Sequence, residues 1–575
     1  MSRFYRSLII YTPTTPIVAE FITTWRTDNP GTSGNSSITI PTTGAGYSYS
    51  VDWGDSTINT GLNGSFTHTY SVPGTYSVKI SGAFPRIYFS SGGDRLKLLK
   101  ITNWGNIGWT SMNNAFSGCS NLQITATGTP NLSAVSDMTR MFNSCTSLVG
   151  TSSMNNWNLS NVNNMSFMFS GATNFNQNIG GWTVSNVTNM INMFEDATNF
   201  DNGGTSSINN WNTSKVQDMS FMFKNAINFN QPIGDWNVGT VSNMNSMFLT
   251  ASNFNQNIGG WTVSNVATMS SMFQGATVFD NGGTSSINNW NTSKVQDMSF
   301  MFKNAINFNQ PIGNWNVGTV SNMNGMFYNT AFNQNIGGWT VSNVTNMQDM
   351  FRDSTVFNNG GTSSINNWNT SKVTTMFLMF YNAFAFNQPI GNWNVGAVIN
   401  MQQMLQSTYF NQDIGGWTVS NVTNMSYMFF NNTVFNNGGT SSINNWNTSK
   451  VTTMSYMFNG ATNFNQPIGN WNVGTVSNMS NMFSGATNFN QNIGSWTVSN
   501  VTNFTNFMST KTPLTFTSSN LDAIYNGWSA KTVKPNINIS FGGASGAKYT
   551  AASSAGRAIL TGGPNNWIIS DGGSY

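Results

Sequence analysis

A tryptophan recurs along most of this chain at short, nearly constant steps, from Trp157 and Trp182 to Trp496. Each step carries Ser-Asn-Val-Thr-Asn-Met-x-x-Met-Phe, a short linker, Asn-Phe-Asn-Gln-x-Ile and Gly-x-Trp, with small variations. The period, about 25 residues, is typical of stacked repeats, in which each unit is stable only against its neighbours. We predict about 16 coils over residues 104–508, of which 14 are regular and two are divergent.

The short repeats are themselves grouped into a longer repeat. Every third step is longer than the others and always contains the insert Gly-Gly-Thr-Ser-Ser, so the larger module spans three coils, as from Trp211 to Trp290. The stretch from Trp211 to Met244 is almost identical to the stretch from Trp290 to Met323. This near-identity indicates duplication of whole modules, which does not favour a single catalytic centre.

Two apolar patterns alternate within a coil. Val187, Met190, Met193 and Phe194 have the spacing of a short helix. The segment 175–179 alternates with period two, which is typical of a strand of about five residues. We therefore predict an α/β repeat solenoid, leucine-rich-repeat-like, with one short strand and one short helix in each coil.

Large apolar side chains occupy one phase of every coil, and we interpret them as a core ladder. The tryptophans could instead form a row of carbohydrate-stacking platforms. Cys119 and Cys145 share one phase in neighbouring coils, where a buried thiol pair or a disulfide could form. The predicted core ladder includes Trp182, Trp211, Trp236, Trp261, Trp290, Phe194, Phe223 and Phe248.

The flanks of the repeats differ from the coils in composition. Residues 1–36 read as an irregular lead-in for attachment, residues 37–82 as short strands with turns, and residues 83–103 as a junction that caps the first coil. Residues 509–575 read as an α+β cap for the last coil, with helices near 520–528 and 549–560 and strands near 536–541 and 567–569.

Residues 51–55 (Val-Asp-Trp-Gly-Asp) and 68–78 resemble a polycystic-kidney-disease-type (PKD) domain, although Ser56 stands where that family has Gly. The resemblance implies an N-terminal immunoglobulin-like β-sandwich. Asp52 and Asp55 fit turn-stabilising positions, with a calcium site as the alternative. We expect no cofactor.

The repeated phrase resembles the BspA-type surface repeat, also described as a mycoplasma-type lipoprotein repeat, which has the same period. The resemblance covers residues 104–508, and a PKD-like domain is a familiar companion of such repeats. It implies a place on a surface and a role in adhesion, without naming a ligand.

Several functional classes are disfavoured by composition. Only 7% of the residues are charged and the net charge is +3, so a nucleic-acid footprint is not expected. No apolar run approaches the ~20 residues of a membrane helix. The chain has one histidine, His68, and one adjacent acidic pair, Glu195–Asp196, and no nucleophile or phosphate-loop motif. We predict that the protein is not an enzyme.

Three polar files are candidate contacts. A lysine recurs once in each module, where it could bind an acidic polysaccharide or serve solubility (Lys215, Lys294, Lys372, Lys450). A glutamine such as Gln256 recurs on the predicted strand. If it points inward, which we favour, the glutamines form an amide ladder along the stack, and if it points outward they form a flat polar face suited to binding glycans. A proline such as Pro389 recurs in every third coil, either as a recognition notch or as an inheritance from duplication.

We expect a non-enzymatic, surface-displayed binding protein that contacts surface glycans or mucins of a host or a neighbouring cell. The apolar part of the N-terminus, residues 8–11, is shorter than that of a signal peptide, which favours a bacteriophage virion fibre or decoration protein. The alternatives are a secreted bacterial cell-surface adhesin and a passive structural spacer of a virion. Other virion proteins would bind the N-terminal segment, and the chain could form homo-oligomers.

Overall fold

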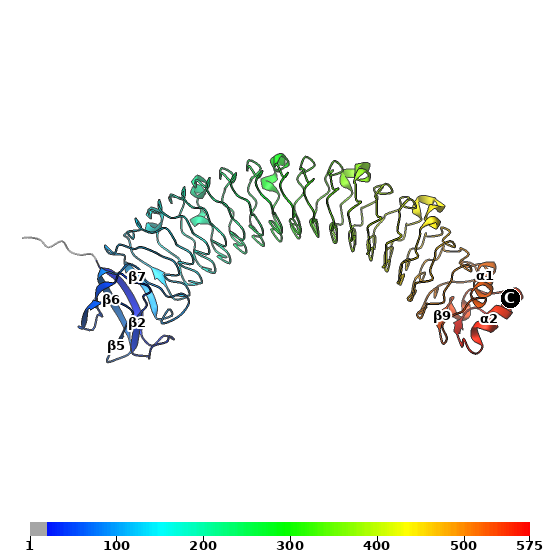
Figure 1. Cartoon of the computed structure of the whole chain (residues 1–575), viewed down its shortest axis with the longest axis horizontal. Coiled ribbons are helices and arrows are strands. Elements are labelled where there is room, and N and C mark those ends of the chain that lie inside the picture. Colours follow the sequence, from blue (N-terminus) through cyan, green and yellow to red (C-terminus); the bar gives the residue numbers. More distant parts are fainter. Residues whose placement is uncertain (1–19) are drawn as a thin grey trace, which may run out of the picture. The chain divides into compact units, whose positions relative to one another are not determined.

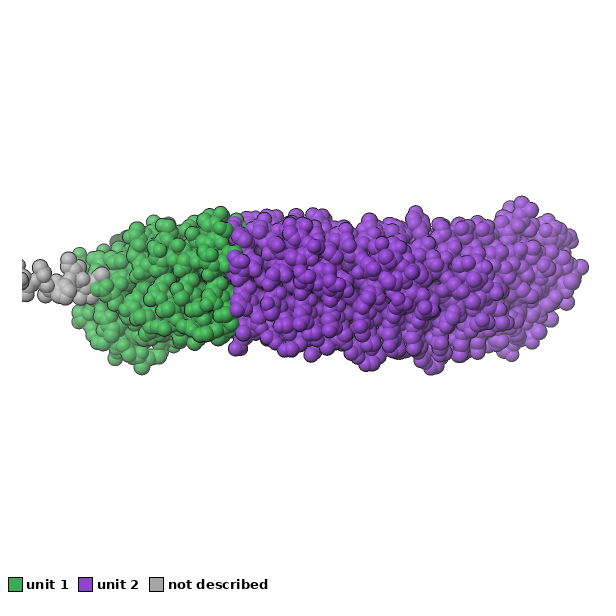
Figure 2. All heavy atoms as spheres, turned by 90° about the horizontal axis from the view of Figure 1, so that it is seen from above, with its two compact units in different colours: residues 1–215 green, residues 216–575 purple. Residues whose placement is uncertain are grey.

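The computed structural model describes residues 20–575, so most of the predicted attachment segment 1–36 lies outside the described residues. The chain forms two compact units, residues 1–215 and residues 216–575 (Figure 2). Within residues 20–575, no helix is both long enough and apolar enough to cross a membrane.

The first unit begins with a mixed sheet of six strands in the order β4-β3-β6-β1-β7-β8, in which only the β7–β8 pair is parallel; β6 and β7 of this sheet are labelled in Figure 1. A second sheet pairs β2 with β5. Coils with three short 3-10 helices follow. The elements are β1 (Phe21–Arg26), β2 (Ser37–Ile40), β3 (Ser48–Asp52), β4 (Ile58–Leu62), β5 (Phe66–Thr69), β6 (Thr75–Ala83), β7 (Leu98–Asn103), β8 (Gln123–Ile124), η1 (Ser152–Asn156), η2 (Asn202–Gly204) and η3 (Ser206–Asn210).

The strand β1 corrects our prediction of an irregular lead-in up to residue 36. It lies between β6 and β7 in the middle of the large sheet. Phe21, Thr23 and Trp25 alternate with more exposed residues and are all buried. This alternation of period two was visible in the sequence, but two threonines and an arginine made the segment look polar.

The second unit consists of coils that follow one another in a single row and end in a C-terminal cap (Figure 1). Its coils contain 3-10 helices only at the Gly-Gly-Thr-Ser-Ser inserts. Its elements are η4 (Asn281–Gly283), η5 (Ser285–Asn289), η6 (Asn359–Gly361), η7 (Ser363–Asn367), η8 (Asn437–Gly439), η9 (Ser441–Asn445), α1 (Ser518–Ser529), β9 (Asn538–Ser540), η10 (Gly543–Ser545), η11 (Ala551–Ser553), α2 (Ser554–Thr561) and β10 (Ile568–Ser570).

The predicted short helix of each coil is wrong. In its place the Met-x-x-Met-Phe segments of neighbouring coils pair side by side, and one residue per coil, from Asp218 to Asn503, forms a parallel β-bridge with the next. Every second N–H donates to a carbonyl of the following coil, as in the pairs Met269–Asp297 (3.0 Å), Ser271–Ser299 (2.8 Å) and Phe273–Met301 (2.9 Å). We call this row of bonds the backbone ladder.

Left-handed residues explain why the segment is not helical. Ser271 has φ 56° and Gly275 has φ 72°, and equivalent positions of the other coils, such as Phe300 (55°) and Asn304 (59°), are also left-handed. A right-handed helix cannot pass through such residues. Tight turns instead close from Met272 N–H to the Met269 carbonyl (3.2 Å) and from Ala276 N–H to the Phe273 carbonyl (3.1 Å). These successive turns give apolar residues the same three- and four-residue spacing as a helix.

The predicted strand at Phe-Asn-Gln-x-Ile is also wrong, because no strand forms there in the described coils. The first asparagine and the isoleucine of this segment donate their N–H groups to side chains of the neighbouring coils rather than to their backbone. For example, Asn255 N–H donates to the Asn230 carboxamide oxygen at 2.9 Å.

The tryptophan core is confirmed, and this excludes the tryptophans as exposed stacking platforms. Trp261 and Trp290 are 3% and 2% exposed, and in the second unit Trp290, Trp368 and Trp446 each stack on the tryptophans before and after them, with ring centroids 5.7–6.4 Å apart. From Trp261 to Trp496, each indole N–H of the repeat donates to an isoleucine carbonyl of the preceding coil, as Trp261 does to Ile233 at 3.0 Å. The predicted phenylalanines of the core ladder are fully buried.

The elements of the C-terminal cap agree with the predicted ones. Helix α1 and strand β9 fall where the sequence indicated them, and α2 and β10 lie within a few residues of their predicted positions. Trp528 in α1 continues the tryptophan pattern, since its indole N–H donates to the Ile493 carbonyl at 3.2 Å. The side chain of Lys511 is buried beneath the cap and donates to the carbonyls of Ala486 (2.5 Å) and Phe489 (2.6 Å).

Because the amine of Lys511 is buried, we expect the stability of the folded protein to depend on pH. Burial lowers the pKa of Lys511 to about 7, whereas the pKa of a lysine in the unfolded chain is ~10.4. Between these values the unfolded chain binds one proton more than the folded chain, so stability rises with pH, by at most about 1.4 kcal/mol per pH unit. We expect the unfolding midpoint of the native protein, measured against that of Lys511→Met, to rise from pH 7 to pH 9. Parallel pH profiles of the two proteins would contradict this expectation.

Candidate binding surface

An asparagine file runs along the surface of the second unit. The asparagine or aspartate of Phe-Asn-Gln in each coil accepts the N–H of the equivalent residue in the next coil, at 2.8–3.1 Å. Within the second unit the file runs from Asn230 to Asn490, whose carboxamide oxygen accepts Thr517 N–H at 3.0 Å, and the first unit contains the equivalent bond from Asp201 N–H to Asn176 at 2.9 Å. A carboxamide oxygen thus replaces the backbone acceptor that a β-ladder would supply. The asparagine file therefore keeps equivalent residues of successive coils in register.

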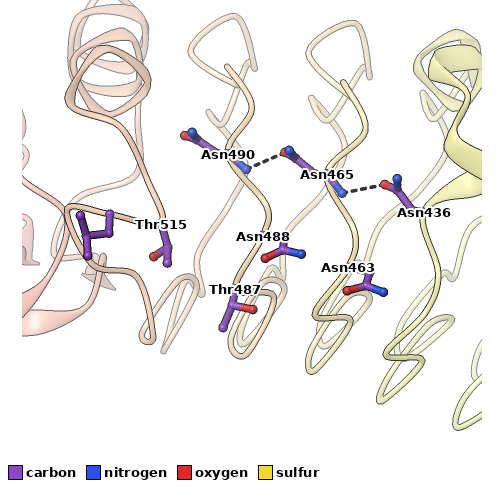
Figure 3. A pocket seen from close by; sticks show the side chains of 8 residues that line it. Asn436, Asn463, Asn465, Thr487, Asn488, Asn490 and Thr515 are labelled. Atoms are coloured by element: carbon purple, nitrogen blue, oxygen red, sulfur yellow. Dashed lines mark hydrogen bonds between the residues drawn. The ribbon is translucent and has the colours of Figure 1, made fainter.

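The last part of the file borders a shallow hollow of about 480 Å³, shown in Figure 3. Asn436, Asn465 and Asn490 lie along its upper side, joined by their hydrogen bonds, and Asn463 and Asn488 lie below them. Its lining is uncharged and contains Leu514, whose side chain is 96% exposed. The hollow offers amide and hydroxyl groups beside one apolar side chain.

Two further hollows lie at the same place in the repeat. All three are lined by the two residues that precede the phenylalanine of Phe-Asn-Gln, which we call the corner residues. One hollow, of about 230 Å³, contains the corner residues Ile306 and Ala331, and the other, of about 310 Å³, contains Phe384 and Tyr409. The corners of the second unit therefore form a row of small concave sites.

Apart from Gln466, which is 8% exposed, the recurring glutamines are half-buried, and side chains such as that of Gln256 bond to the asparagine file rather than to one another, so the inward amide ladder is wrong. Gln256 Nε2 donates to the Asn230 carbonyl at 2.8 Å and to its carboxamide oxygen at 2.9 Å. Gln334, Gln412 and Gln491 make the same pair of bonds to the preceding asparagine. The glutamine amide reaches back along the stack and reinforces the asparagine file.

The lysine file is exposed and regularly oriented. In the second unit, Lys294, Lys372 and Lys450 each donate to an asparagine carboxamide of the preceding coil at 2.6 Å. Within residues 216–575 none of these three lysines forms an ion pair. In the first unit, Lys215 makes the equivalent bond to Asn186, also at 2.6 Å. The positive charge of each lysine thus stays available at a fixed place in its coil.

One proline of the periodic set lines a hollow of about 340 Å³. Pro389 shares it with Asn366, Asn392, Gln412 and Asp413. This geometry suits a recognition notch, although inheritance through duplication explains the periodicity of the prolines equally well.

Cations and aromatic rings alternate on the outer side of the backbone ladder. Lys303 Nζ lies 5.1 Å from the Phe300 ring centroid and 5.0 Å from that of Tyr328. Arg352 lies between Tyr328 (5.0 Å) and Tyr381 (5.3 Å). Asp349 and Asp353 pair with Arg352 at 3.3 Å and 3.4 Å, so this guanidinium is already neutralised.

The two aspartates of the N-terminal motif stabilise turns. Asp52 accepts Gly54 N–H and Asp55 accepts Thr57 N–H, both at 3.0 Å. Their other oxygens bind Lys79 (2.9 Å) and His68 (2.8 Å), and the Lys79 bond lowers the pKa of Asp52. In the part of the chain that the structure describes, no group of three or more His, Cys, Asp or Glu residues could hold a metal ion.

The remaining sequence candidates lie in the first unit. Cys119 and Cys145 are free, buried thiols, and burial raises the pKa of both. Cys145 donates to the Phe116 carbonyl at 3.1 Å. In the acidic pair Glu195–Asp196, the Glu195 carboxylate accepts the Asn192 amide at 2.6 Å.

One family model matches the coils in five consecutive, slightly overlapping segments. The family is described as "Mycoplasma protein of unknown function, DUF285", and its model matches residues 110–206, 202–286, 281–364, 359–441 and 437–549. The chain belongs to this family. A search of curated proteins and a search of solved structures gave no match.

The DUF285 matches agree with the module read from the sequence. The three middle matches each begin near one insert and end near the next, so one DUF285 match spans about three coils, whereas the last match extends into the C-terminal cap. The mixed N-terminal sheet, from β1 to β7, lies before the first match. The surface-type tandem repeats of this chain are therefore DUF285 units.

The corner hollows are the sites that sequence reasoning missed. A comparison of the modules contains a hint of these sites, because the corner residues vary while most of the coil around them is identical. Ile306 corresponds to Phe384 of the next module, and Ala331 corresponds to Tyr409. Without the fold, nothing showed that these two positions of neighbouring coils lie together.

Proposed function

We propose that the protein is a non-enzymatic, surface-displayed binding protein that attaches to glycans or mucins. The observation that carries this proposal is the regular register of the coils in the second unit. Because of it, the asparagine file and the lysine file present the same polar side chains at regular intervals along the surface. Regularly repeated weak contacts gain avidity on a multivalent partner. A carpet of surface polysaccharide or mucin is such a partner.

The finer fold assignment supports this role. We propose that the coils form a solenoid of the leucine-rich-repeat-like kind and belong to BspA-type surface repeats. The support is the coil-to-coil pairing of backbone, asparagines and tryptophans. We also propose that the N-terminal sheets form a PKD-like, immunoglobulin-like sandwich, on the strength of the motif at residues 51–55 and the two-sheet arrangement.

The proposed setting is the surface of a bacteriophage virion, as a fibre or decoration protein held by other virion proteins through its N-terminal segment. A secreted bacterial cell-surface adhesin is the alternative, and a passive virion spacer is the third. A mass-spectrometric inventory of purified particles and of the cell envelope separates the first two settings. Finding the protein only in the envelope would overturn the virion setting.

Glycan and mucin arrays printed at two densities test the binding function itself. We expect the full chain to bind at high glycan density and to lose at least about ten-fold in apparent affinity at low density, because fewer coils then bind at once. The triple variant Lys294→Gln, Lys372→Gln, Lys450→Gln then decides the role of the lysine file: loss of acidic glycans alone identifies a polysaccharide site, and unchanged binding assigns the lysines to solubility. No binding to any glycan or mucin would overturn the proposal in favour of the spacer.

A further inference from the structure

One corner hollow of the second unit differs in chemistry from its counterparts. It lies between neighbouring coils and has a volume of about 310 Å³. Two aromatic side chains stand in it where the preceding module has Ile306 and Ala331. Its lining residues are Phe384, Ser407, Thr408, Tyr409, Asn431 and Thr433.

The two aromatic rings are exposed and held next to each other. Phe384 is 43% exposed and Tyr409 is 59% exposed, although most phenylalanines of the coils are fully buried. Tyr409 N–H donates to the Phe384 carbonyl at 3.1 Å, which fixes the two residues on adjacent coils. Among residues 20–575 neither ring stacks on another aromatic ring. Both rings therefore offer free faces to a ligand.

The polar groups around the rings are unpartnered and neutral. Within the described chain, the Ser407 hydroxyl, the Asn431 amide, the Thr433 hydroxyl and the Tyr409 hydroxyl make no hydrogen bond to other protein atoms. No charged residue lines the hollow. These groups supply both donors and acceptors.

We propose that this hollow binds one neutral pyranose unit of a glycan. A pyranose has an apolar C–H face, which packs on an aromatic ring, and a rim of hydroxyl groups, which need neutral donors and acceptors. The volume lies at the lower end of the range of small-molecule sites. This proposal rests on the proposed glycan-binding function and assigns it one specific subsite.

The same chain contains a matched control site. The equivalent hollow of the preceding module is lined by Ile306, Asn329, Thr330, Ala331, Asp353, Thr355 and Val356. It has aliphatic side chains in place of both rings and an aspartate in place of Asn431. Its volume is about 230 Å³. Since this chain already folds with Ile and Ala at these positions, Phe384→Ile and Tyr409→Ala should not disturb the coils.

Saturation-transfer NMR and titration of the full chain with neutral methyl pyranosides test the subsite, with the methyl glycosides of glucose, galactose, mannose and N-acetylglucosamine as probes. We expect at least one of them to bind the native protein, and the variant Phe384→Ile with Tyr409→Ala to bind it at least about ten-fold more weakly. Thermal unfolding that matches the native protein excludes a folding defect.

The reciprocal variant provides a gain of function. Ile306→Phe with Ala331→Tyr and Asp353→Asn is expected to raise the stoichiometry of the bound pyranoside from one to two. Binding of none of the probes, or equal binding by the native protein and the double variant, would overturn the subsite. If the double variant keeps full pyranoside binding while the array still shows glycan attachment, the subsite fails and the proposed function stands. If the array shows no attachment at all, the proposed function itself fails.

Discussion

Replacing Asn359 with alanine is expected to lower the free energy of unfolding by about 2–4 kcal/mol. Asn359 is fully buried in the insert of its module. Its carboxamide oxygen accepts Ile336 N–H of the preceding coil at 2.9 Å, and its amide donates to the Thr362 carbonyl (2.9 Å) and the Ser364 hydroxyl (3.2 Å). Alanine removes these partners and leaves the buried Ile336 N–H and the partly buried Thr362 carbonyl unpaired, which costs more than the bonds themselves are worth.

Two further variants distinguish the loss of the Asn359 hydrogen bonds from backbone strain as the cause of the destabilisation. Asn359 has φ 50°, which asparagine and glycine adopt more easily than alanine, so Asn359→Gly retains the backbone freedom and removes only the amide. We expect it to remain strongly destabilised. Asn367 is exposed, and its side chain makes no hydrogen bond within residues 20–575, so Asn367→Ala should change stability by less than about 0.5 kcal/mol. Chemical denaturation of the three variants gives the comparison, and a neutral Asn359→Gly would show that backbone strain alone decides.

We expect the second large change in stability at one of two adjacent glycines, Gly337 and Gly338. A Cβ at Gly337 would overlap the Ser364 hydroxyl and lie 2.5 Å from the Ser364 carbonyl carbon, whereas a Cβ at Gly338 would meet nothing within 4 Å. We expect Gly337→Ala to destabilise the protein by about 3 kcal/mol, since the coils cannot separate without breaking the Asn359 bonds. Gly338→Ala should be neutral or stabilising by up to about 1 kcal/mol, because it restricts the unfolded chain.

The unfolding midpoints of the two alanine variants check this expectation directly, because the mutations are chemically identical and lie at adjacent positions. Equal midpoints would mean that the insert does not press against the preceding coil. The same contact recurs in the other modules of the second unit, at Gly259 with Ser286 and at Gly415 with Ser442. Alanine at either position should therefore reproduce the loss found at Gly337.

The candidate sites show what a single sequence can and cannot indicate. The lysine file was predicted, since Lys294 and its equivalents recur at a fixed phase, and the structure places them on the surface. The hollow around Phe384 and Tyr409 was not predicted. These two residues are a whole coil apart in the sequence, and they lie together only because the backbone ladder fixes the register of one coil on the next.

The sequence by itself determined the period, the module, the buried tryptophans and the elements of the cap, because each depends on the spacing of apolar residues along the chain. The tertiary structure decided the conformation inside the coil. Successive tight turns with left-handed residues such as Ser271 give apolar side chains the same spacing as a helix, and only the hydrogen bonds to the next coil distinguish the two. The asparagine file was likewise hidden, because the partner of each asparagine side chain belongs to a different coil.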